Sequence, residues 1–152
     1  MPTPTPNPTY REAASFAFKR VIDLIDNYSV FKTVNGYWHM ANTLDTCLQH
    51  LLIAQRGNRL DAFNLVEHAL DKVFDVRMQD KGKPVKPTDW GKWSRRDDGP
   101  WADDYGWWGL ALTRAYRNRE RLGYDATFSN RILNYARNSF TALAYAWILP
   151  KQ

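Results

Sequence analysis

The chain has 152 residues, about the length of one domain, and 44% of them are hydrophobic, which is enough to bury a single core. Charged residues make up 24%, and no apolar run is long enough to cross a bilayer, so the sequence predicts a globular protein with no membrane partner. The net charge of +5 would suit nucleic acid, but the basic residues are scattered; their densest run is Arg114, Arg117, Arg119 and Arg121. We expect this run at a helix C-terminus, where the helix dipole favours cations, and therefore predict no nucleic-acid partner.

Residues 1–9 form a Pro/Thr-rich tail with the composition of an extended polyproline segment. The tail has neither the basic start nor the apolar stretch of a secretion signal. Thr9 and Glu12 then make a capping box, which is typical of a helix start. The apolar residues that follow recur at helical spacing: Ala14, Phe18, Val21 and Ile25. The sequence therefore predicts a helical domain over residues 10–152.

Two further helices are predicted before the middle of the chain. One spans about 40–55 and ends before Gly57; the other spans about 61–74. From 78 to 100 the helical periodicity stops, and this stretch contains several Gly and Pro residues together with Trp90 and Trp93. A connection of this length without periodicity is usually functional or disordered, and two Trp residues favour the first alternative.

Helical periodicity resumes after Pro100, a residue well suited to a first helical turn, and it continues to Gly123. The buried stripe of this helix is predicted to be Tyr105, Trp108, Leu112 and Ala115. A last helix is expected over about 126–147. With no convincing strand, the prediction is an all-α fold of about five helices arranged as antiparallel helical hairpins.

Asp103 and Asp104 are the strongest candidates for catalytic residues. Glycoside hydrolysis needs two carboxyl groups, one to protonate the leaving oxygen and one to attack the sugar or activate water. Adjacent helical residues point about 100° apart, so we predict that the two carboxyls lie on either side of a ligand at the ~5 Å separation of retaining enzymes. The alternative is that the pair only stabilises a helix start.

Aromatic residues surround the acid pair. Five of the seven Trp lie in or just before this segment, at positions 90, 93, 101, 107 and 108. Flat aromatic faces suit stacking with sugar rings, although the spacing of Trp108, Leu112 and Ala115 is equally that of an ordinary core.

Two segments carry a resemblance to a known family. They are Trp101-x-Asp103-Asp104-x-x-Trp107-Trp108-x-Leu110-Ala111-Leu112-x-x-Ala115-Tyr116 and, upstream, Trp38-His39-Met40-Ala41-Asn42-Thr43-Leu44. Together, and in this order, they resemble signatures of the family 76 glycoside hydrolases, the endo-α-1,6-mannanases. The resemblance implies that Asp103 is the nucleophile and Asp104 the acid/base.

The resemblance also implies a partial (α/α)6 barrel that acts on α-1,6-linked mannose polymers and is secreted or periplasmic. The chain would correspond to about the N-terminal two-fifths of a family member, with the remaining barrel half or a second copy as a partner. Predicted contacts to an oligo- or polysaccharide are Trp38, His39, Asn42, Trp90, Trp93, Trp101, Tyr105, Trp107 and Trp108. Two alternatives stay open: a non-catalytic sugar-binding or structural helical remnant, and a barrel of the epimerase or glucuronyl-hydrolase kind.

No cofactor or metal is predicted. His39, His50 and His68 are the only histidines, and no pair of them has metal-ligand spacing on one helical turn. The single Cys47 excludes an intrachain disulfide.

Overall fold

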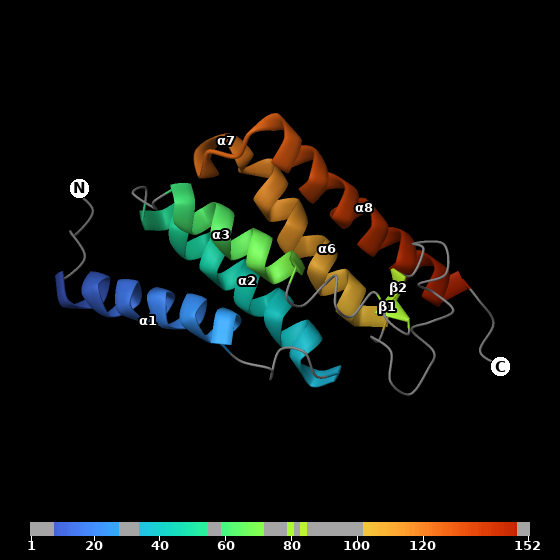
Figure 1. The fold of residues 1–152 in the computed structure, drawn as a ribbon, viewed down its shortest axis with the longest axis horizontal. Coiled ribbons are helices and arrows are strands. Elements are labelled where there is room, and N and C mark those ends of the chain that lie inside the picture. Colours follow the sequence, from blue (N-terminus) through green and yellow to red (C-terminus); the bar gives the residue numbers. More distant parts are fainter. Residues whose placement is uncertain are drawn as a thin grey trace, which may run out of the picture.

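The computed structural model describes residues 8–27, 34–54, 59–71, 79–80, 83–84 and 102–148. Within these ranges it has six helices: α1 (Pro8–Asn27), α2 (Val34–Ala54), α3 (Arg59–Ala69), α6 (Ala102–Arg117), α7 (Arg119–Leu122) and α8 (Ala126–Ile148) (Figure 1). A two-residue antiparallel ladder joins β1 (Gln79–Asp80) to β2 (Lys83–Pro84). The all-α prediction is confirmed, and the ladder, which the sequence did not predict, is too short to form a sheet layer.

Two helix starts differ from the prediction. α2 begins at Val34 rather than near residue 40, because its buried stripe extends one turn earlier, to the fully buried Tyr37. α1 begins at Pro8, so Thr9 lies inside the helix rather than at its N-cap. The predicted first-turn residue Pro100 lies outside the described residues.

α2 and α6 are far apart in the sequence but lie side by side and run in the same direction (Figure 1). Three polar contacts keep a nearly constant offset along the pair: Trp108 with Tyr37, Arg114 with Asp45, and Arg121, just beyond α6, with Leu52. Residue numbers therefore increase in the same direction along both helices, so the two helices are parallel.

α3 and α8 form a second parallel pair. The rings of Phe63 and Phe128 lie 4.3 Å apart, and one turn further along, Arg131 forms ion pairs with Glu67 and Asp71. α3 runs opposite to α2 and α8 opposite to α6, so each couple is an antiparallel hairpin (Figure 1). The prediction of antiparallel helical hairpins is therefore correct.

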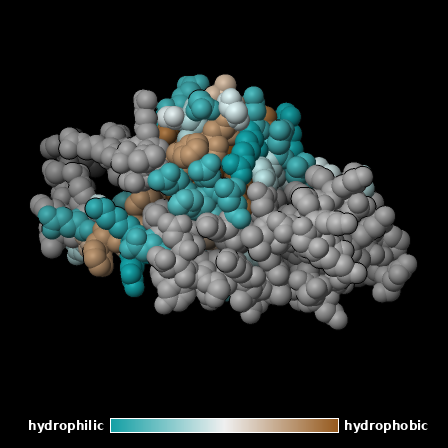
Figure 2. All heavy atoms as spheres, viewed as in Figure 1, coloured by the Kyte–Doolittle hydropathy of each residue, from teal (hydrophilic) through white to brown (hydrophobic). Residues whose placement is uncertain are grey.

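The core lies between these helices. Its largest fully buried side chains include Trp108, Tyr37, Tyr105, Met40, Leu44, Leu65, Leu112 and Ile132. α6 approaches α8 closely at Gly109, where an added Cβ would lie 2.8 Å from the Phe140 ring. On the visible surface, hydrophilic and hydrophobic residues are interspersed over the described part of the chain (Figure 2). No helix among the described residues is long and apolar enough to span a membrane.

The turn between α7 and α8 is built from two residues with specific backbone roles. Gly123 has φ 75° and ψ 24°, a left-handed conformation that lets it end α7, as the sequence predicted. Asp125 then caps α8: its Oδ1 accepts a hydrogen bond from the backbone N–H of Phe128 at 2.7 Å. This turn fixes the α6–α8 hairpin and with it the orientation of α6.

Candidate functional site

α6 leaves one face exposed along its whole length. The exposed residues recur at alternating spacings of four and three: Asp103, Trp107, Leu110, Arg114 and Arg117. Because a helix turns about 100° per residue, residues at this spacing share one face. α2 likewise exposes Trp38, with Asn42, half-buried, one turn further along. We call these seven residues the open face.

A groove runs between the two helices on the open face. Its volume is about 590 Å³, and its lining residues are Asn42, Asp45, Trp107, Leu110, Thr113, Arg114, Arg117 and Asn118. The α6 part, from Trp107 to Asn118, is ~16 Å long at 1.5 Å per residue. We call it the α2–α6 groove. It brings together Asn42 and Trp107, two of the predicted sugar contacts, from segments 65 residues apart.

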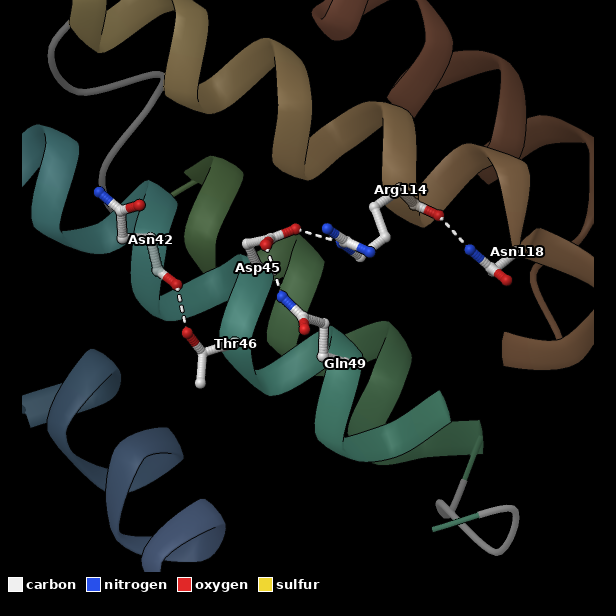
Figure 3. A network of polar contacts seen from close by, with 6 residues as sticks. All are labelled: Asn42, Asp45, Thr46, Gln49, Arg114 and Asn118. Atoms are coloured by element: carbon white, nitrogen blue, oxygen red, sulfur yellow. Dashed lines mark hydrogen bonds and ion pairs between the residues drawn. The ribbon is translucent and has the colours of Figure 1, made fainter. Parts of the chain in front are cut away.

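A polar network built around Asp45 holds the walls of the groove together (Figure 3). The Arg114 Nε donates to Asp45 Oδ1, and Gln49 Nε2 donates to Asp45 Oδ2 at 2.8 Å. Both carboxylate oxygens of Asp45 therefore accept hydrogen bonds from other side chains. Close by, Thr46 donates to the Asn42 carbonyl at 2.9 Å. The ion pair links α2 to α6 and neutralises the acidic group of the groove.

The two predicted catalytic acids occupy different environments. Both lie in the first turn of α6, where the helix dipole favours negative charge. Asp103 is exposed on the open face, whereas Asp104 is 3% exposed. Asp104 shares its helix face with the buried Trp108 and Ala111. The about 100° between consecutive residues thus separates the pair into one accessible carboxyl and one buried carboxyl.

The aromatic residues near the acid pair also divide by burial. Trp107 is 44% exposed and lines the groove, whereas Tyr105 and Trp108 are fully buried. The Trp108 Nε1 donates to the Tyr37 carbonyl at 3.0 Å, and the rings of these two residues lie 5.4 Å apart. Tyr105 and Trp108, which the sequence placed among the sugar contacts, therefore pack in the core and do not face the groove.

The remaining predicted contacts are distributed as follows. Trp38 is 41% exposed, and its ring lies 3.7 Å from that of the neighbouring exposed His39. Trp90, Trp93 and Trp101 lie outside the described residues. Within the described part of the chain, no cluster of three or more His, Cys, Asp or Glu side chains could hold a metal ion.

The sequence interpretation missed five lining residues with polar side chains: Asp45, Thr113, Arg114, Arg117 and Asn118. A signal for two of them was available. Tyr105 and Trp108 define the buried face of α6. Residues on the opposite face recur at alternating spacings of four and three, and this pattern includes Arg114 and Arg117. Nothing local indicates that Asp45 meets this face, because it lies on another helix.

Comparison of the chain with protein-family models, with curated proteins and with solved structures found no match in any of the three. The resemblance to family 76 glycoside hydrolases therefore rests on the motif residues alone.

Proposed function

We propose that this chain is a carbohydrate-active helical domain of the endo-α-1,6-mannanase type, which holds an α-1,6-linked mannose polymer along its open face. One observation carries the proposal. Trp38 and Asn42 from the first motif share the open face with Asp103 and Trp107 from the second. Two indoles, an amide and a carboxylate on one accessible surface suit a sugar, which offers apolar C–H faces and hydroxyl groups together.

A retaining two-carboxylate mechanism would give the two acids different roles. Asp103, exposed at the start of α6, is placed to attack the anomeric carbon. The acid/base role then falls to Asp104, which is 3% exposed. Asp104 would protonate the leaving oxygen and later take a proton from the attacking water.

The helix arrangement supports the barrel part of the proposal. In an (α/α)6 barrel, neighbouring inner helices run parallel, and each is paired with an antiparallel outer helix. α2 and α6 would be two inner helices, and α3 and α8 their outer partners (Figure 1). The further helices of the barrel would come from another chain segment or from a second copy.

The test is hydrolysis of α-1,6-mannan, measured as the release of reducing ends. We expect Asp103→Asn and Asp104→Asn each to abolish the activity, because an amide can neither attack as an anion nor transfer a proton. Glu120→Gln is the matched control, since Glu120 is an exposed acid on α7 away from the groove. Full activity in both Asn variants would overturn the assignment.

A non-catalytic sugar-binding domain is the second candidate, and the 3% exposure of Asp104 favours it, because a glycosidic oxygen must reach the acid. In this case mannan oligosaccharides should change the tryptophan fluorescence of the parent without being hydrolysed. Trp107→Phe should reduce that change, because Trp107 is a half-exposed indole that lines the groove. A folded chain with neither activity nor a fluorescence response would remove both candidates.

A further inference from the structure

Four arginines cluster around the end of α6, and the structure gives a partner to three of them. The partners are Asp45 for Arg114, the Tyr116 carbonyl and Glu120 for Arg119, and the Leu52 carbonyl for Arg121. The side chain of Arg117 forms no hydrogen bond or ion pair with any described residue. Its side chain is exposed and lines the α2–α6 groove.

The helix C-terminus does not require the Arg117 side chain as a cap. The Arg114 carbonyl accepts hydrogen bonds from the Asn118 backbone N–H at 3.2 Å and from Asn118 Nδ2 at 2.9 Å. The Tyr116 carbonyl accepts from the Arg119 guanidinium at 3.2 Å. Other residues therefore donate hydrogen bonds to these carbonyls near the end of α6. The Arg117 side chain interacts favourably with the helix dipole but is not needed as a hydrogen-bond donor there.

Among the described residues, the groove consequently carries a positive charge with no acid paired to it. Asp45 is the one acid among the described residues that line the groove, and Arg114 already neutralises it. The other lining residues are uncharged apart from Arg117. A guanidinium presents a planar set of donors that matches the two oxygens of a carboxylate or phosphate.

We propose that the α2–α6 groove binds an anionic oligosaccharide, with a sugar ring on Trp107 and a carboxylate or phosphate substituent on Arg117. The proposal rests on the proposed function, since it assigns the charge of the glycan held at the same site. Trp107 and Arg117 are ten residues apart on one helix face, about 15 Å at 1.5 Å per residue. A ligand that contacts both must therefore be an oligosaccharide rather than a monosaccharide.

The experiment compares three probes by titration calorimetry at low salt: α-1,6-linked mannotetraose, the same tetrasaccharide with one phosphate monoester, and the same with one uronate residue. We expect the parent to bind at least one charged probe about tenfold more tightly than the neutral one, the effect of one charge-assisted hydrogen bond. The preference should shrink at high salt, because the groove is open to water. The tighter of the two charged probes identifies the anion.

Arg117→Gln should remove this tenfold preference, so that the charged and neutral probes bind the variant with equal affinity. Arg137→Gln is the matched control: Arg137 is an exposed arginine on α8, outside the groove, and its loss should preserve the preference. Equal affinity of the parent for all three probes, or a preference that survives Arg117→Gln, would overturn the anionic-ligand proposal while leaving mannan binding intact. Binding of no probe by the folded parent would instead overturn the proposed function and this proposal with it.

Discussion

Trp107 and Trp108 are adjacent in the sequence, yet replacing each with phenylalanine should have very different effects. Trp108 is fully buried and donates a hydrogen bond to the Tyr37 carbonyl at 3.0 Å. Trp107 is 44% exposed on the groove wall. We expect Trp108→Phe to lower the free energy of unfolding strongly and Trp107→Phe to lower mainly the affinity for sugar.

The magnitude follows from these contacts. Trp108→Phe removes one buried hydrogen bond, worth about 1 kcal/mol, and part of a buried ring, worth about 2 kcal/mol, so the expected cost is roughly 3 kcal/mol. Trp107→Phe trims a ring that is already half in water, and the expected cost is below about 1 kcal/mol.

The assay is urea unfolding followed by far-ultraviolet circular dichroism, because tryptophan fluorescence changes with the substitution itself. The parent protein and each variant are unfolded under the same conditions, and the midpoints and slopes are compared. Costs that agree within about 0.5 kcal/mol would refute the division of the two indoles between core and groove.

Three further predictions concern stability. Gly106→Ala should stabilise the protein by up to about 1 kcal/mol in thermal unfolding, because alanine favours a helix and the added Cβ makes only ordinary contacts. Gly109→Ala should not give this gain, since its Cβ would lie 2.8 Å from the Phe140 ring. Equal gains in the two variants would contradict the close approach of α6 to α8 at Gly109. Asp125→Ala should lower the free energy of unfolding by about 1 kcal/mol through the lost N-cap, whereas Asp125→Asn should keep most of the stability that the cap contributes. An alanine variant as stable as the parent would contradict the cap. Burial raises the pKa of the Cys47 thiol from 9.0 to about 11, so its contribution to stability is complete below pH 9 and is lost as the pH rises through 11. Between about pH 8 and about pH 10.5, the free energy of unfolding of Cys47→Ala, measured by urea titration, should therefore fall by about 2 kcal/mol less than that of the parent. Equal falls in the two proteins would contradict the raised pKa.

Most of the helices could be predicted from sequence because amphipathic spacing is a local property. What failed depended on distant contacts. Tyr37 belongs to the buried stripe of α2 only because the α6 ring of Trp108 packs on it, 71 residues away. The break between α6 and α7 at Asn118 was also missed, since the sequence shows no Gly or Pro there.

The candidate site was predictable in part for the same reason. Asp103 and Trp107 are one turn apart, so their shared face follows from helix geometry. Leu112 lies one turn after Trp108 on the same helix face, and this spacing also indicates that Trp108 is buried. A buried Trp108 argues against the sugar contact that the aromatic composition had favoured for this residue. That no described residue pairs with the Arg117 side chain could not be predicted, because the acid of the groove, Asp45 on α2, pairs with Arg114 on α6 instead.

The acid pair shows why stability and activity must be measured together. Consecutive helical residues point about 100° apart, and in this pair Asp103 is exposed whereas Asp104 is 3% exposed. Asp103→Asn should then cost at most about 1 kcal/mol, the interaction of an exposed anion with the helix dipole. Asp104→Asn changes a buried group and should cost about 1–3 kcal/mol more in urea unfolding. If Asp104 is the acid/base, that destabilised variant, assayed well below its unfolding temperature, should bind mannan oligosaccharides as the parent does and hydrolyse none. If Asp104 serves only the helix start, the variant should lose stability while hydrolysis per folded molecule stays at the parent level, and this result would remove Asp104 from the mechanism.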